Sequence, residues 1–425
     1  MGEGHRTIRV GYGVMARWLN LDDVPGLLAP GQRVFVAGSC GEPQAMLAAI
    51  AADPDCAREV TFVQQPLPIN QYDLSSFHKS AHQETFFVTP SLKNGLATGG
   101  VLFTPMQMRN IFDHVAGMPV DIALLSAARD QQGTIRYSAN VDYLDAARAA
   151  ARAIVVEVSE AYVAPLTCPV VDEAEVDYLV SCDSSVMTYP VTEPDETSAV
   201  IGAHIARLIR DGDCLQTGIG AVPAAILAKL SDKNDLGFHG GLIDDGVMKL
   251  IETGNINGQS KPIDTGRHVT GMALGSDSLH QWLTTNESVM FRSANYTHDY
   301  QVIAQIPGFV SINSAVEIDL FGQINAEVAG GRQISGTGGS VDFMRASKAS
   351  QGGRSVVAMA STARGGTVSR IVPTVEMVTA LRTDVDIVVT EFGVAELFDA
   401  PLQERAERLI SIAHPDFQDQ LRYGD

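Results

Sequence analysis

The sequence predicts an α/β protein with mostly parallel sheets, on three observations. Short runs of β-branched residues alternate with segments of helical periodicity along the whole chain, a rhythm typical of parallel strands covered by helices. Residues 33–37 and 214–217 are strand-like runs that each end in a glycine-containing turn before a helical segment. The chain has 425 residues, enough for two domains with a full core each. We expect two related α/β domains, residues 1–188 and 189–425.

In the first half, the apolar run of residues 33–37 predicts a buried strand, and a helix follows over residues 43–52. Further strands are expected at residues 85–88, 121–125, 154–158 and 177–180. Residues 186–195 contain two prolines and little periodicity, which indicates a connection between the halves.

In the second half, an apolar stripe that includes Val200, Ile201 and Ile205 predicts a helix. The strand of residues 214–217 then runs into a glycine turn. Later strands are expected at residues 269–274, 310–313, 356–360 and 385–390, and an amphipathic helix at residues 402–413.

Two glycine-rich segments are candidate ligand sites. Residues 335–343, Ser-Gly-Thr-Gly-Gly-Ser-Val-Asp-Phe, contain Gly336, Gly338 and Gly339 before an apolar, strand-like pattern returns. Such a turn lets backbone N–H groups face an oxyanion or a phosphate. The second segment, with Gly218 and Gly220, has Pro223 where a dinucleotide fingerprint needs its third glycine. It is a plain strand-to-helix turn, or a helix N-terminus that faces an anion.

Three further side chains carry possible chemistry. His298 is a lone histidine, a residue that is either structural or a proton carrier near neutral pH. Asp244 and Asp245 are adjacent carboxylates, and because sequence neighbours rarely face one another, we expect Asp245 to cap the helix that runs to Glu252.

Composition excludes several classes of function. The chain has 30 Lys plus Arg against 50 Asp plus Glu, a formal charge of −20, so we expect no nucleic-acid partner. The five cysteines are scattered without metal-ligand spacing, so neither a disulfide framework nor a metal site is predicted. Residues 1–6 lack a secretion or myristoylation signal, and no apolar run reaches membrane length. These features predict a cytoplasmic protein with no membrane partner.

Several motifs together resemble the acetyl-CoA hydrolase/4-hydroxybutyrate CoA-transferase family. They are residues 86–90, 141–143, 215–220, 310–319, 322–325, 335–343, 367–373, 390–397 and 413–417. The resemblance covers almost the whole chain. It implies two domains of the CoA-transferase-like (NagB/RpiA-type) α/β fold, an active site between them, an acyl-CoA substrate and a homodimer. It implies no bound cofactor, because coenzyme A enters as part of the substrate.

The resemblance also reveals two departures. Family transferases attack the thioester with a glutamate in a His-(Ser/Thr)-Glu-Met motif, but this chain has His-Gly-Gly-Leu, with Gly241 at the nucleophile position. His298 stands where related transferases have an oxyanion-stabilising asparagine. The other oxyanion donor, a backbone N–H of the glycine turn, carries over to Gly339. The expected coenzyme A contacts are Gly218, Gly220, Gly336, Gly338 and Gly339, with Arg345 and Lys348 for the phosphates.

We therefore expect hydrolysis of an acyl-CoA by water, with His298 as general base or oxyanion donor, since an imidazole with its usual pKa suits proton transfer at neutral pH. The glycines at 240 and 241 are expected to leave room for a water molecule or a bulkier acyl group. Alternatives are CoA transfer through a displaced carboxylate (Asp244 or Glu327), direct acyl transfer, carbon–carbon hydrolysis and acyl-CoA binding without turnover. A sugar-phosphate isomerase is a more distant alternative.

Overall fold

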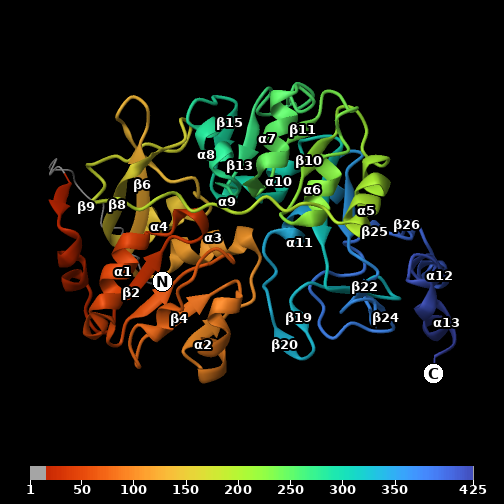
Figure 1. Cartoon of the computed structure of the whole chain (residues 1–425), viewed down its shortest axis with the longest axis horizontal. Coiled ribbons are helices and arrows are strands. Elements are labelled where there is room, and N and C mark those ends of the chain that lie inside the picture. The colour runs from red at the N-terminus through yellow and green to blue at the C-terminus, as the bar shows by residue number, and fades with distance from the viewer. Residues whose placement is uncertain (1–15, 425) are drawn as a thin grey trace, which may run out of the picture.

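The N-terminal half is built on one large sheet. The structure, a computed structural model, describes residues 16–424, so the segment 1–6 lies outside the described residues. The sheet order is β1 (Arg17–Leu19), β9 (Tyr178–Cys182), β8 (Ala151–Val163), β6 (Val120–Arg129), β2 (Arg33–Val36), β3 (Thr61–Val63), β4 (His82–Thr85) and β5 (Val101–Phe103). These neighbours all pair in parallel, and β7 (Ile135–Tyr137) adds antiparallel to β6. Figure 1 shows this half in red to yellow.

The C-terminal half contains a second, smaller sheet. Its order is β11 (Gly237–Phe238), β10 (Cys214–Gln216), β16 (Phe309–Ser314), β21 (Arg354–Ala358), β25 (Ile387–Thr390) and β26 (Gly393–Glu396). Only β26 pairs antiparallel among these strands. The α/β class with mostly parallel sheets is therefore confirmed.

Short strand pairs lie outside the two large sheets. They join β12 (Leu242–Ile243) to β14 (Met272–Ala273), β13 (His268–Thr270) to β15 (Val289–Phe291), β19 (Val328–Ala329) to β20 (Arg332–Gln333), and β22 (Thr362–Ala363) to β23 (Val368–Ser369). A three-stranded group has the order β18 (Ile324–Asn325), β17 (Glu317–Asp319) and β24 (Ile371–Val372).

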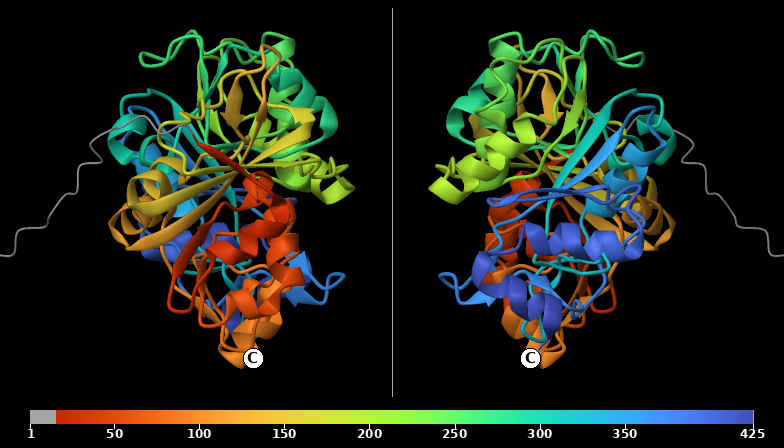
Figure 2. Two further views of the ribbon diagram at one scale, coloured as in Figure 1. Left: turned by 90° about the vertical axis from the view of Figure 1, so that its left-hand side faces the viewer. Right: turned by 90° about the vertical axis from the view of Figure 1, so that its right-hand side faces the viewer.

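Helices cover the sheets. Their bounds are α1 (Gln44–Ala52), α2 (Lys93–Thr98), α3 (Met108–Gly117), α4 (Leu144–Ala150), α5 (Glu196–Ala206), α6 (Ala221–Leu227), α7 (Asp245–Glu252), α8 (Asp277–Leu283), α9 (Ala294–Thr297), α10 (Tyr300–Ile303), α11 (Ser340–Ala349), α12 (Leu402–Ser411) and α13 (Pro415–Tyr423). Helices α12 and α13 lie on the outer end of the C-terminal half (Figures 1 and 2). Within residues 16–424 no helix is both long and apolar enough to cross a membrane.

Three sequence predictions were wrong in detail. The strand expected at residues 85–88 ends at Thr85 as β4, and the run of residues 269–274 is split between β13 and β14, which pair with different strands. The strand-like pattern after the glycine turn is the helix α11. Its apolar residues Val341, Phe343 and Met344 are buried at a spacing that suits a helix face.

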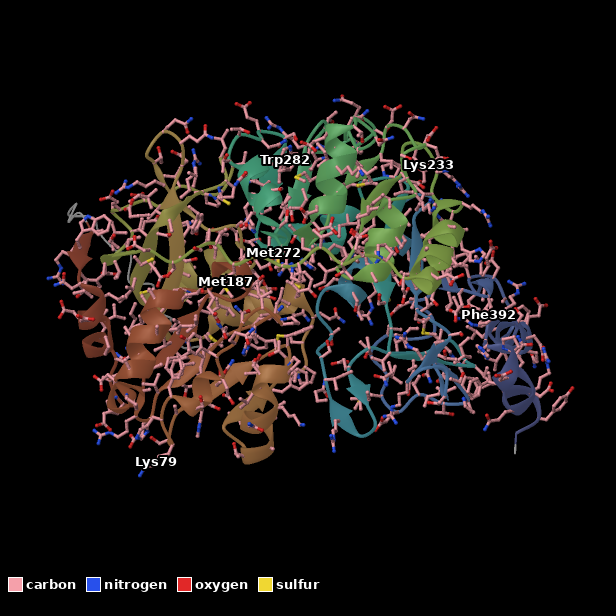
Figure 3. All side chains as sticks on the ribbon, viewed as in Figure 1. Lys79, Met187, Lys233, Met272, Trp282 and Phe392 are labelled. Carbon is pink, nitrogen blue, oxygen red and sulfur yellow. The ribbon has the colours of Figure 1, made fainter. Side chains whose placement is uncertain are left out.

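The two halves share one hydrophobic core. A single cluster of buried side chains includes Phe86 and Tyr137 from the first half and Phe238 and Val310 from the second. Met272 lies near the middle of the molecule (Figure 3), where its sulfur accepts a hydrogen bond from the Ser39 hydroxyl at 3.3 Å. Because apolar burial is the dominant stabilising term in folding, the halves are fixed against each other at the place where the candidate site lies.

Candidate active site

The glycine turn of residues 335–339 lies where the two halves meet. A Cβ atom at Gly336 would be 2.6 Å from the carbonyl oxygen of Phe86, so only glycine allows this close approach. Gly338 has a left-handed backbone conformation, with φ +54°. Its carbonyl oxygen accepts a hydrogen bond from the Met108 N–H at 3.3 Å. Gly339 is the N-cap residue of α11, so the turn presents the positive end of a helix dipole and its first N–H groups.

His298 lies between the two glycines that were singled out from the sequence. A Cβ atom at Gly241 would be 2.9 Å from His298 Cε1 and 3.0 Å from Nε2. A Cβ atom at Gly339 would be only 2.4 Å from the same Nε2. The Phe343 ring packs against the imidazole with 4.5 Å between ring centroids. Three chain segments that are far apart in sequence therefore converge on one imidazole.

This packing corrects the expected open space. The room beside Gly241, predicted to hold water or a bulkier acyl group, is filled by the imidazole of His298. Real Cβ atoms almost never approach another heavy atom below 3.0 Å, so a side chain at either glycine requires His298 to move.

The electrostatic state of His298 also differs from the expectation. The side chain is buried, and this desolvation lowers its pKa to about 3. The imidazole is therefore neutral at physiological pH, and the expectation of an ordinary histidine pKa is wrong. Its Nδ1 lies 2.8 Å from the buried Thr297 hydroxyl. When that hydroxyl donates to Nδ1, the tautomer has its proton on Nε2, the atom next to both glycines.

Asp299 fixes the loop that carries His298, but it does not contact the imidazole through any described hydrogen bond. Its carboxylate accepts hydrogen bonds from the N–H groups of Gln301 and Val302, which caps α10. It also forms an ion pair with Arg109, with 3.0 Å between Nε and Oδ2. The Arg109 N–H in turn donates to Asp342 at 3.2 Å. The start of α3 is thus bonded to both sides of the site.

Asp142 is a site neighbour that sequence reasoning did not single out. It is buried, and its Oδ1 has no hydrogen-bond partner among the described residues. A Cβ atom at Gly271 would be 2.0 Å from this oxygen and 3.1 Å from the carbonyl oxygen of Gly241. Burial raises the pKa of Asp142 to about 8. The only sequence signal was the family-like stretch of residues 141–143.

The carboxylates at 244 and 245 have structural partners. Asp244, not Asp245, caps α7, with its Oδ1 accepting from the Val247 N–H at 2.9 Å. The expectation for Asp245 is wrong by one residue, because α7 begins one residue earlier than a cap at Asp245 requires. Asp245 instead accepts hydrogen bonds from the N–H and the hydroxyl of Ser276.

Glu327 lies in a groove between the halves. The groove encloses about 460 Å³. Its lining residues are Phe103, Pro105, Met106, Gln107 and Asn110 from the first half and Glu327, Gln333, Thr337, Met377, Val378 and Thr379 from the second. The Glu327 carboxylate accepts a hydrogen bond from the Thr379 hydroxyl at 2.8 Å. A carboxylate therefore lies in the same groove as the glycine turn.

The remaining predicted coenzyme A contacts lie elsewhere. Gly220 precedes α6 at φ +112° and lines a pocket together with Asp244 and Asp245, while a Cβ atom at Gly218 would meet no atom within 4 Å. Arg345 forms an ion pair with Asp384 at 3.1 Å, and Lys348 with Asp386 at 2.6 Å. A phosphate would have to compete with these carboxylates, so the assignment of both cations to coenzyme A stays a prediction. In the described part of the chain no group of three His, Cys, Asp or Glu could hold a metal ion.

Comparison with known proteins gives the site its context. Residues 17–189 match the acetyl-CoA hydrolase/transferase N-terminal domain, and residues 275–424 match the C-terminal domain. The chain is 34% identical over 397 residues to 4-hydroxybutyrate coenzyme A transferase from Clostridium kluyveri, which covers 92% of each protein. It is 28% identical over 275 residues to an acetyl-CoA hydrolase from Candida albicans, 59% of this chain and 50% of that protein. The crystal structure of RipA from Yersinia pestis has a TM-score of 0.89 at 30% identity, over 96% of both chains.

Proposed function

The chain belongs to the acetyl-CoA hydrolase/transferase family and has its CoA-transferase-like fold, and from this premise we propose that it hydrolyses an acyl-CoA thioester directly, without a covalent glutamyl intermediate. The thioester carbonyl oxygen lies between the Gly339 N–H and His298 Nε2–H. Water attacks the carbonyl carbon, the carbon–sulfur bond breaks, and coenzyme A leaves as the thiolate. The proton that the water loses ends on this thiolate, so the products are a carboxylic acid and coenzyme A.

One observation carries the proposal: His298 Nε2 faces both Gly241 and Gly339, at the positions where the family resemblance puts the nucleophile and the oxyanion donor. With a pKa near 3, the imidazole is a weak base but a competent hydrogen-bond donor in its neutral form. We therefore assign His298 the role of oxyanion donor rather than general base. Loss of one such donor typically costs about 100- to 1,000-fold in kcat.

The N-terminus of α11 supports the second donor. Gly339 is the N-cap of this ten-residue helix, and the first N–H groups of a helix have no partner inside it. Developing negative charge on the thioester oxygen is favoured at such an end. The coenzyme A part of the substrate is the only cofactor in the scheme. A homodimer and a cytoplasmic location stay predictions.

The test is the release of free thiol from acetyl-, butyryl- and succinyl-CoA, each with and without acetate as an acceptor. We expect thiol release that does not depend on the acceptor. Exchange of the acyl group only when acetate is present, with no free thiol, contradicts direct hydrolysis.

The position of Glu327 favours one second candidate, CoA transfer through a displaced carboxylate. Glu327 shares the groove with Thr337, whereas Asp244 is engaged as a helix cap. A transferase of this kind forms a glutamyl-CoA thioester at Glu327, which remains attached when the protein is denatured after incubation with acyl-CoA. Intact-protein mass spectrometry distinguishes it from hydrolysis.

A further inference from the structure

The groove beside the glycine turn has a distinctive lining. Apolar side chains face it from both halves, with Phe103 and Met106 on one side and Met377 and Val378 on the other. Met377 and Val378 are exposed by 46% and 42%, so these neighbouring side chains offer apolar surface to a ligand in the groove. Flexible methionines on opposite walls suit an aliphatic chain of variable shape.

The groove lining carries negative charge only. Glu327 is its single ionisable lining residue among the described residues, and no lysine or arginine side chain of residues 16–424 lines it. Arg332, which neighbours the lining residue Gln333, lies exposed on β20 and is not part of the lining. The groove therefore offers an anion only neutral amide and hydroxyl donors and no cation, and its one charged group is the largely buried Glu327 carboxylate.

The groove also borders the glycine turn that carries Gly339. Thr337 lines it two positions before Gly339, whose N–H holds the thioester oxygen in the function proposed above. The volume of about 460 Å³ lies within the usual range for small-molecule pockets, about 300–1,000 Å³.

We propose that this groove receives the acyl group of the substrate and that Glu327 selects acyl groups without a negative charge, which makes monocarboxylic acyl-CoA thioesters the substrate class. This proposal rests on the proposed function in one respect, the position of the thioester carbon next to Gly339. An apolar chain gains contact with the methionine and phenylalanine walls. An acyl group with a terminal carboxylate meets Glu327 in a groove without a cation, and like charges in such a site are strongly disfavoured.

The test compares butyryl-CoA with succinyl-CoA, whose acyl chains have the same number of carbons and differ in the terminal carboxylate. Binding of the non-hydrolysable thioether analogue of each, and of free coenzyme A, is measured by calorimetry, so that turnover does not disturb the readout. We expect the wild-type protein to bind butyryl-CoA about tenfold or more tightly than succinyl-CoA. Glu327→Gln should reduce this ratio about tenfold, through tighter succinyl-CoA binding. Glu376→Gln, which removes the same charge from an exposed residue outside the groove, should leave the ratio unchanged.

A second variant keeps the test valid if Glu327→Gln fails to fold. Met106→Ala shortens a half-buried wall residue and should weaken butyryl-CoA binding several-fold while free coenzyme A binding stays within about twofold. Equal weakening of butyryl-CoA and free coenzyme A binding would place the pantetheine arm in the groove and overturn the proposal. A wild-type preference for succinyl-CoA over butyryl-CoA would also overturn it. Absence of thiol release with every acyl-CoA, together with the expected binding ratios, would refute the proposed hydrolysis but not the acyl selectivity.

Discussion

Replacing Gly241 by glutamate tests whether His298 occupies the space of the family's nucleophile. Gly241 does not have a positive φ, so the backbone tolerates a side chain there. The new Cβ atom would, however, be 2.9 Å from His298 Cε1. His298 cannot easily turn away, because Phe343 packs against one side and Thr297 is bonded to Nδ1.

The expected cost follows from this overpacking. Forcing extra atoms into a packed interior costs about 1–3 kcal/mol, and the buried carboxylate adds to this cost. His298→Asn replaces the ring by the smaller side chain that the family resemblance puts at this position. In the double variant the glutamate regains its space, so we expect a favourable coupling free energy of about 1 kcal/mol or more.

The assays are urea unfolding of the four proteins of the cycle and acetate-dependent acyl exchange. Exchange activity, with coenzyme A bound covalently to the denatured protein, should arise only when glutamate at 241 and asparagine at 298 are combined. The reasoning is refuted if Gly241→Glu alone is as stable as the wild type, or if the two substitutions act additively on the free energy of unfolding.

Three further predictions concern single residues. His298→Ala should lower thiol release about 100- to 1,000-fold with coenzyme A affinity within about twofold; equal loss of both would indicate a purely structural role. Gly339→Ala should destabilise the protein, because its Cβ would be 2.4 Å from His298 Nε2, whereas Gly117→Ala, where a Cβ would meet no atom within 4 Å, should be close to neutral in thermal unfolding. Asp142, whose pKa is raised to about 8, keeps its proton in the folded state between about pH 4 and 8 while the unfolded chain loses it. Wild-type stability should therefore fall as pH rises through this window, by up to about 1.4 kcal/mol per pH unit, and Asp142→Asn should become progressively more stable than the wild type between pH 5.5 and 7.5 in urea unfolding; a constant difference would contradict the assignment.

Short sequence patterns predicted the strands and helices whose residues carry a clear strand or helix signal. The buried strands β2 and β16 follow from runs that contain β-branched residues, and α12 follows from its amphipathic spacing. The helix α11 was missed because its first apolar residues, Val341 and Phe343, alternate with the polar Asp342, which fits a strand as well as a helix. Its helical state depends on packing against β16 and β21, which no local window contains.

The sequence predicted which residues belong to the site but not how they contact one another. The motifs indicated Gly241, His298 and Gly339, but their mutual contact joins segments separated by tens of residues. The low pKa of His298 follows from burial, which is a tertiary property. Asp142 was not predicted for the same reason. Its sequence neighbours do not distinguish it from other aspartates, and its oxygen becomes buried without a hydrogen-bond partner only in the folded protein.

The two departures from the family pattern compensate each other in space. Losing the glutamate side chain at 241 alone would leave a cavity, which costs about 24 cal/mol per Å³; a larger side chain at 298 fills that volume. Packing alone does not explain why this side chain is an imidazole, since a leucine would fill a buried space without two nitrogen atoms that need hydrogen-bond partners. His298 satisfies one nitrogen through Thr297 and directs the other toward Gly339. A polar atom that is costly to bury and aimed at the start of a helix is better explained by a ligand oxygen than by packing.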